Sequence, residues 1–266
     1  MVSDVLDPLF APAGEGLWHP APHARGPWAP DLLHGGAPAA LLCGLLEAHD
    51  PGSDMAVVRV AFDFFSAVPM ADLKVRGPSV VKPGGRFAVL EAALEAGGRT
   101  VVTARAVRLR RGELELPARD QGAAAPMPPP DSGRASAGFA PIDGPGFHTT
   151  AVEVRFAGGA PGTGTAQAWF RLGCAVVPEA QPTPLQRVAA AADFGNGISH
   201  ALPFEEFLFV NCDLTIHLHR EPAGEWVGLD ARTDVSPEGV AQATSVLHDE
   251  AGRIGVSAQS LFVEPR

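Results

Sequence analysis

The sequence predicts an α+β protein built from two copies of one unit, each a helix combined with an antiparallel sheet. An internal repeat aligns residues 92–109 with residues 246–263 without gaps, so that Arg105 falls on Gln259. Each half also carries one apolar segment at helical spacing, among shorter segments rich in β-branched and aromatic residues. A stretch of prolines, glycines and small residues separates the halves, which favours a tandem of two units over one large domain.

Composition narrows the class of protein. The 266 residues include 46% hydrophobic and 19% charged side chains, which is typical of a globular protein able to bury a core. A net charge of −10 argues against nucleic acid or an anionic membrane surface as a partner. Cys43, Cys174 and Cys212 are widely spaced in apolar sequence, so we expect reduced core thiols. No segment has the length of a membrane span and the N-terminus lacks a signal-peptide pattern, which predicts a cytoplasmic protein without membrane insertion.

The first half is predicted to begin with a buried helix. Residues 38–48 (PAALLCGLLEA) place four leucines on one face, and Gly35 and Gly36 lie just ahead of the helix. Proline suits the first turn of a helix because that turn needs no backbone donor. Four strand-like segments follow in the order expected of an antiparallel meander: 56–65, 73–81, 86–96 and 99–110.

The second half repeats this order after a hairpin. Residues 184–194 (PLQRVAAAADF) form the second predicted helix, and aligning the two proline starts puts Glu47 on Asp193. The predicted strands of this half are 151–156, 166–172, 207–220, 226–233, 240–249 and 253–265. We therefore divide the chain into an N-terminal unit at 1–118, a linker rich in proline, glycine and alanine at 119–138, and a C-terminal unit at 139–266.

A long apolar helix wrapped by an antiparallel sheet is the pattern typical of a hotdog unit. Two such units predict a double hotdog whose sheets pair into one. The segments DLTIHLHREPAGEWVGLDA (213–231) and GRIGVSAQSLFVEPR (252–266) resemble the bacterial acyl-CoA thioesterase II (TesB-type) family and its thioesterase-like relatives. The resemblance is strongest from Ala190 to Arg266 and is architectural in the first copy. It implies an acyl-CoA thioesterase that needs no cofactor.

The resemblance also implies site residues. In that family an Asp on the second helix, a Thr at the start of the next strand and a Gln on the last strand hold the hydrolytic water. Matching AADFGNGIS, FVNCDLTIHLHR and SAQSLFVEPR to this pattern places the Asp at Asp193 and the Gln at Gln259, with Asn211 at the Thr position. A thioester carbonyl is electrophilic enough for attack by water that a carboxylate deprotonates. Burial and the C-terminal end of a helix both disfavour negative charge, which would make Asp193 a stronger base.

Other readings of these residues remain open. Asp193 could be a helix-end carboxylate, and Gln259 a structural hydrogen-bonding group. Strand alternation places Asn211 opposite the apolar face, so a bulge, or a sheet face opened to a tunnel, would be needed to turn it inward.

Further candidates lie outside this trio. His34, Gly35 and Gly36 could let a substrate or the other copy approach the first helix closely, or could serve packing alone. His217 and His219 have no third ligand at a supporting spacing, so we expect no metal site. A serine-nucleophile motif and a phosphate-binding loop are both missing from the sequence.

The leading hypothesis is an enzyme that hydrolyses an acyl-CoA thioester to the free acid and CoA. The alternative is a catalytically weak or inactive acyl-thioester-binding protein, in which Asn211 has removed competence. A hotdog dehydratase is a third class, suggested by His23 in the segment HARGP. Double hotdogs of the resembled family associate further, so a homo-oligomer, such as a dimer of double hotdogs, is a candidate assembly.

The repeat also predicts which of the two halves carries the active site. If Arg105 stands opposite Glu47, the two would form an ion pair, whereas Gln259 opposite Asp193 would leave that carboxylate free for water. We therefore expect the first half to be structural, lining and completing the binding site, and the second half to carry the one active site per chain.

Overall fold

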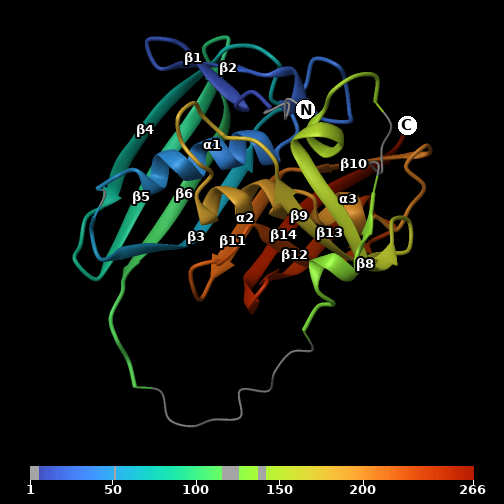
Figure 1. Ribbon diagram of the computed structural model, residues 1–266. Helices are drawn as coiled ribbons and strands as arrows, with labels where there is room; N and C mark the ends of the chain where they lie inside the picture. Colours follow the sequence, from blue (N-terminus) through green and yellow to red (C-terminus); the bar gives the residue numbers. More distant parts are fainter. Residues whose placement is uncertain (1–5, 51, 116–125, 137–141) are drawn as a thin grey trace, which may run out of the picture.

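A computed structural model describes residues 6–50, 52–115, 126–136 and 142–266. Its strands form one antiparallel sheet, and the two principal helices lie side by side on one face of that sheet (Figure 1). The strand order is β1-β2-β4-β5-β6-β3-β11-β14-β13-β12-β9-β8-β7, and β10 pairs with β14 beside this path. The predicted arrangement of two units with paired sheets is confirmed.

The first unit contains the predicted helix and all four predicted strands. The helix α1 (Gly36–Glu47) buries Leu41, Leu42 and Leu46 against the sheet. The four strands are β3 (Met55–Phe64), β4 (Leu73–Lys82), β5 (Phe87–Ala96) and β6 (Arg99–Arg110). An N-terminal hairpin and a short 3-10 turn precede the helix: β1 (Phe10–Gly14), β2 (Leu17–Pro20) and η1 (Pro22–Ala24).

The second unit has a shorter helix and a divided strand. The helix α2 (Pro184–Ala192) ends earlier than predicted, and α3 (Gly195–Ser199) follows it. The predicted strand 207–220 breaks at Cys212 into β10 (Phe207–Asn211) and β11 (Asp213–Leu218). The remaining elements are η2 (Pro130–Ser132), β7 (Arg134–Ala135), η3 (Phe147–Ala151), β8 (Val152–Ala160), β9 (Thr165–Leu172), β12 (Trp226–Val235), β13 (Val240–Asp249) and β14 (Gly252–Pro265).

The two units join through their sheets and their helices. Strands β3 and β11 pair antiparallel, with Ala61 opposite Thr215. The helices α1 and α2 also run antiparallel, because Gly35 at one end lies against Asp193 while Glu47 at the other end accepts a hydrogen bond from Thr183. A Cβ at Gly36 would lie 2.6 Å from the Ala190 carbonyl oxygen, so this glycine permits the close approach of the helices.

The hairpins of the two units reveal that the gapless repeat is one residue out of register. The hairpin β5–β6 closes on the pair Ala96–Arg99, whereas β13–β14 closes on Asp249–Gly252. Each hairpin also carries one bulge. When residues are counted along β6 and β14 from the closing pairs and through these bulges, Gln259 corresponds to Ala106. A one-residue slip moves a side chain to the opposite face of the sheet.

The predicted counterpart of Gln259 is therefore wrong. The Arg105 guanidinium lies on the exposed face, 2.7 Å from the Glu91 carboxylate, and the predicted ion pair with Glu47 does not form. Ala106 takes the buried position in the first unit. The first unit therefore has no amide at the position that Gln259 takes in the second unit.

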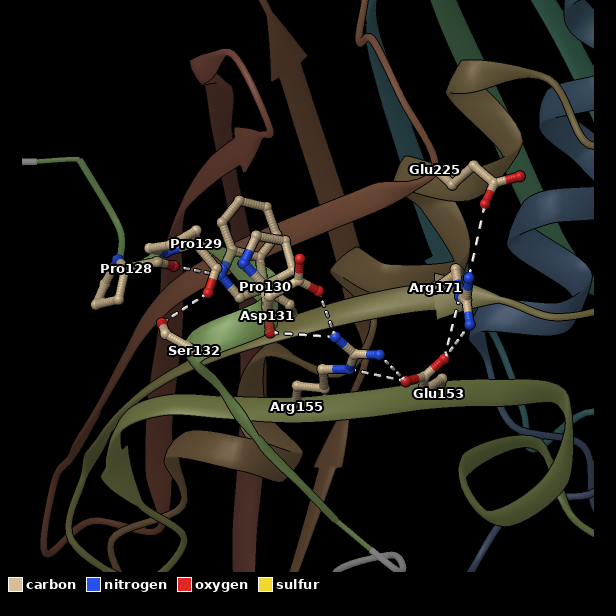
Figure 2. Close-up of polar contacts among 10 residues, drawn as sticks. Pro128, Pro129, Pro130, Asp131, Ser132, Glu153, Arg155, Arg171 and Glu225 are labelled. Atoms are coloured by element: carbon tan, nitrogen blue, oxygen red, sulfur yellow. Dashed lines mark hydrogen bonds and ion pairs between the residues drawn. The ribbon is translucent and has the colours of Figure 1, made fainter.

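The described part of the segment between the units packs on the C-terminal unit. Residues 119–125, 137 and 138 of the predicted linker lie outside the described residues, so its boundaries remain a prediction. Within it, Met127 packs against Trp169 and Trp226, and the Pro128 carbonyl accepts a hydrogen bond from the Trp169 indole at 2.7 Å. Figure 2 shows Arg155 reaching both Asp131 of this segment and Glu153 of β8.

Two further predictions concern the cysteines and membrane-spanning segments. Cys43 and Cys174 are buried thiols as predicted, but Cys212 is exposed at the break between β10 and β11, so its prediction as a core thiol is wrong. Within the described ranges, no helix combines the length and the hydropathy required to cross a bilayer.

Candidate active site

Asp193 occupies the point where α2 ends. Helix α2 begins with a capping box, in which Thr183 and Gln186 satisfy each other's backbone N–H groups, and Asp193 is its C-terminal cap. Gly195 follows, and a Cβ there would lie 2.8 Å from the Gln259 side-chain oxygen. This glycine therefore lets the chain turn from α2 into α3 against β14. The Asp193 carboxylate is buried, with 6% of the residue exposed.

Both carboxylate oxygens of Asp193 have a polar neighbour. Asn211 donates a hydrogen bond from Nδ2 to Oδ1 at 3.0 Å, and the His34 ring nitrogen Nδ1 lies 3.0 Å from Oδ2. The break at Cys212 is what brings Asn211 inward, as the alternation argument required. A carboxylate oxygen has two lone pairs, so each oxygen keeps one for a further donor such as water.

His34 is held in a fixed orientation from the N-terminal unit. Its ring packs against both Phe147 and Phe194, with centroid distances of 4.8 Å and 4.4 Å, and these two rings also stack on each other at 5.8 Å. Nδ1 accepts a hydrogen bond from the Gly36 backbone at 3.1 Å in one tautomer and donates to Asp193 in the other. The second tautomer satisfies the buried carboxylate, so His34 links α1 of one unit to α2 of the other.

Gln259 lies directly behind this cluster. Its side-chain oxygen accepts a hydrogen bond from the Asn196 backbone at 3.0 Å, and its Nε2 donates to the Asp193 main-chain oxygen at 3.4 Å. Only 2% of the residue is exposed, and its side chain does not line the cavity beside Asp193. Gln259 therefore holds the backbone between α2 and α3, which positions the Asp193 carboxylate.

A cavity of about 50 Å³ adjoins the Asp193 carboxylate. Its polar lining residues include His34, Asn196, His200 and Asn211, and Gly35 also lines it, whereas Gly36 packs against α2 instead. Among the described residues, the Gly35 backbone N–H has no hydrogen-bond acceptor. A cavity of this volume has room for water, which needs about 10–15 Å³ per molecule.

Aromatic residues that the sequence analysis missed also line the cavity. Trp28 of the N-terminal unit stacks on Phe204 at 5.3 Å, and Phe209 stacks on His200 at 5.6 Å. Arg266 lies over the Phe204 ring at 4.8 Å. The aromatic residues of PFEEFLFVN, directly before Asn211, were the sequence signal for this wall. Beyond Phe209 a smaller hollow of about 10 Å³ is lined mainly by apolar residues, including Leu202, Ala241 and Leu261.

The structure separates the remaining candidate residues from this cluster. His23 is a buried residue of η1 whose pKa is lowered by burial, and it does not line the cavity. His217 and His219 stand on or beside β11, and within the described part of the chain no group of three potential ligands could hold a metal ion.

A double hotdog with a buried carboxylate between its two units, facing a cavity with room for water, defines a hotdog-fold protein of the thioester-hydrolysing class. The model of the acyl-CoA thioesterase N-terminal domain matches residues 24–109, and that of the C-terminal domain matches residues 119–263. The chain belongs to the acyl-CoA thioesterase family, and it is a thioester hydrolase by class. The resemblance to thioesterase II noted in the sequence is confirmed.

Solved structures agree with this fold. A protein from Novosphingobium aromaticivorans DSM 12444 assigned as a thioesterase is 25% identical, with a TM-score of 0.68, over 97% of this chain and 99% of that chain. A hot dog fold protein from Alicyclobacillus acidocaldarius is 16% identical, with a TM-score of 0.71, over 96% and 95%. Acyl-CoA thioesterase II TesB2 from Mycobacterium marinum is 16% identical, with a TM-score of 0.64, over 97% and 96%. No curated protein sequence matches the chain.

Proposed function

We propose that the chain hydrolyses an acyl-CoA thioester to the free acid and CoA at the cavity beside Asp193. The observation that carries this proposal is the Asp193 carboxylate itself, which is buried, contacted on both oxygens by residues of different units, and next to space for water. A buried carboxylate with unused lone pairs is suited to orient and deprotonate a water molecule. No cofactor enters the proposed reaction.

The reaction follows from this geometry. Water hydrogen-bonded to Asp193 attacks the thioester carbonyl carbon while one of its protons passes to the carboxylate. The tetrahedral intermediate then collapses, the carbon–sulfur bond breaks, and the proton goes from Asp193 to the departing sulfur. Free acid and the CoA thiol leave, and Asp193 is again ionised.

Gly35 is our candidate for stabilising the oxyanion. Its backbone N–H, which has no acceptor among the residues that the structure describes, lies at the N-terminal end of α1, where the helix dipole favours negative charge. A Cβ at this position would lie 2.8 Å from Asp193 Oδ2, so only glycine allows the backbone this close to the carboxylate. His34 and Asn211 would hold the carboxylate, and Gln259 would hold the turn that carries it.

Replacing Asp193 with Asn tests the proposal. We expect Asp193→Asn to lower thiol release from a panel of acyl-CoAs of different chain length by about 10²–10⁴-fold, because the amide cannot accept the proton from water. The control is Asp31→Asn, which makes the same change on an exposed residue with no described side-chain bond. Full activity in Asp193→Asn, with circular dichroism like that of the wild type, would refute the assignment.

One observation favours a second candidate function. The Asn211 amide contacts Asp193 Oδ1 directly at 3.0 Å and so occupies one position from which a hydrolytic water could bind. A protein in which this contact persists would bind the acyl thioester without turning it over. Thermal stabilisation by acyl-CoA with no thiol release, in the wild-type protein, is the result that would select this function.

A further inference from the structure

A second cavity, of about 530 Å³, lies at the opposite end of the helix pair from Asp193. It is lined by Glu47 at the end of α1 and by Pro184 at the start of α2, together with the ends of β3, β6 and β11. Helix α2 has nine residues, so its two ends are about 13 Å apart. Since α1 and α2 run antiparallel, this cavity is the counterpart, in the internal repeat, of the cavity beside Asp193.

The second cavity combines an apolar floor with a charged rim. Its apolar lining residues, called the floor below, come from three strands and α2: Ala56, Val57, Val58, Leu109, Leu185 and Leu218. Its rim carries Arg110, Arg111, His219, Arg220 and Glu221. Volumes of about 300–1,000 Å³ are typical of sites for small molecules. The cavity is therefore large enough to hold an organic molecule with an apolar body.

The charges on the rim do not cancel. Arg111 pairs with Glu221 at 2.8 Å, and Arg220 makes two bonds to Asp249 at 2.5 Å and 2.6 Å. Among the described residues, Arg110 has neither an ion pair nor a side-chain hydrogen bond, so its positive charge is available. An unpaired guanidinium beside an apolar floor is well suited to a carboxylate or phosphate group.

The Glu47 carboxyl group also lines this cavity. Burial raises the pKa of its carboxyl group, the hydrogen bond from Thr183 opposes that rise, and the nearby Glu221 charge adds to it. Burial therefore favours the neutral form of Glu47 at the edge of the apolar floor.

We propose that this second cavity binds an organic anion with an apolar body, whose carboxylate or phosphate group pairs with Arg110 while the body lies on the floor formed by β3, β6 and β11. The site goes beyond the hydrolysis proposed at Asp193 and does not depend on it. None of the residues that line it contacts the Asp193 carboxylate.

Calorimetric titration of the full chain with decanoate, decyl phosphate and decanol tests this site. We expect at least one of the two anions to bind about tenfold or more tightly than decanol, because decanol has the same chain without the charge. Arg110→Glu should weaken binding of that anion by about tenfold or more, and Glu47→Gln should leave it as tight or tighter. The control is Arg99→Glu, the same charge reversal on an exposed residue at the β5–β6 turn.

Each outcome decides the proposal. Equal affinity for decanol and both anions, or no binding of any probe, would overturn it. Anion binding that Arg110→Glu leaves unchanged would place the ligand elsewhere, including the cavity beside Asp193, and would overturn it as well. Thiol release from acyl-CoA should be unchanged in Arg110→Glu, so failure of this proposal is distinguishable from failure of the proposed hydrolysis.

Discussion

At the scale of single residues, Asn211 stands where the resemblance to thioesterase II implies a Thr, and it contacts the proposed catalytic carboxylate of Asp193. A threonine hydroxyl can donate one hydrogen bond and accept others, whereas the Asn211 amide presents two donors and reaches the carboxylate directly. The contact holds Asp193 in place and also competes with water for Oδ1. The balance between these two effects sets how much of the carboxylate remains for catalysis.

Substitutions at position 211 separate these effects. We expect Asn211→Leu, which is similar in size but has no donor, to lower thiol release by about tenfold or more, because the buried carboxylate loses a hydrogen bond. Asn211→Thr should keep at least wild-type activity, since its hydroxyl can still donate to Asp193 or to water. Steady-state kinetics on one acyl-CoA distinguish the variants. Equal kcat in Asn211→Leu and wild type would show that this contact has no part in the reaction.

Asp249 provides a second test at this scale, in the dependence of stability on pH. Burial opposes its charge, but hydrogen bonds from Arg220 and from the Ala223 and Ala251 backbones together lower its pKa below the usual value. A lowered pKa in the folded state stabilises the protein above the unfolded pKa of about 3.9, and this stabilisation is lost as the pH falls through the folded value.

We therefore expect Asp249→Asn to be less stable than the wild type by about 3 kcal/mol at pH 7, since it leaves Arg220 without its carboxylate. The difference should shrink steadily when urea unfolding is repeated between pH 5 and pH 3. A difference that stayed constant over this range would contradict the assignment of the stabilisation to the Arg220–Asp249 pair.

At the scale of elements, the two helices show how local signals position the site. The capping box at Thr183 starts α2 at a defined residue, and the approach of Gly195 to Gln259 ends the helix at Asp193. The helix therefore has a set length, which places the carboxylate at the junction with α3. The Thr183 hydroxyl also donates to Glu47 and so ties the start of α2 to the end of α1.

Removing the cap tests this element. We expect Thr183→Ala to lower the stability of the protein by about 1–2 kcal/mol, because the Gln186 backbone N–H and the Glu47 carboxylate each lose a partner. Thr100→Ala, on an exposed residue of β6, is the control and should change stability by less than about 0.5 kcal/mol. Equal melting curves for Thr183→Ala and the control would show that the cap contributes nothing measurable.

At this scale, strand register is the feature that the sequence predicted wrongly. The identical pairs Gly98/Gly252 and Arg99/Arg253 favour a gapless alignment. Each hairpin, however, closes on a pair of residues that the identity of the side chains does not predict. The register is set by this closing pair and by the bulge that follows it. Arg105 consequently lies on the exposed face rather than opposite Glu47.

At the scale of the whole molecule, the site exists only because the two units pack together. His34 and Gly35 come from one unit, whereas Asp193 and Asn211 come from the other. The α1–α2 contact and the β3–β11 pairing therefore determine the geometry of the site as much as the overall stability. The described residues 127–132 add a further contact, since they cover part of the outer face of the C-terminal unit (Figure 2).

A methyl group between the helices tests this coupling. We expect Gly36→Ala to lower stability by about 1–3 kcal/mol and thiol release by about tenfold or more, because its Cβ would lie 2.6 Å from the Ala190 carbonyl and would displace His34 and Gly35. Gly85→Ala is the control, since its Cβ meets no atom within 4 Å. Thermal melting and acyl-CoA turnover together measure the effect. Wild-type values in both for Gly36→Ala would mean that the helices can separate without cost.

The sequence by itself determined the two-unit architecture, the helices, most of the strands and the family, because periodicity and short motifs are properties of neighbouring residues. It also pointed to Asp193, Asn211 and Gln259 through the resemblance to thioesterase II. Only the tertiary structure decided that His34 contacts Asp193, that Gln259 stands behind the carboxylate, and that Ala106 is its counterpart in the first unit. These relations depend on packing between distant segments and on a one-residue register, neither of which local pattern records.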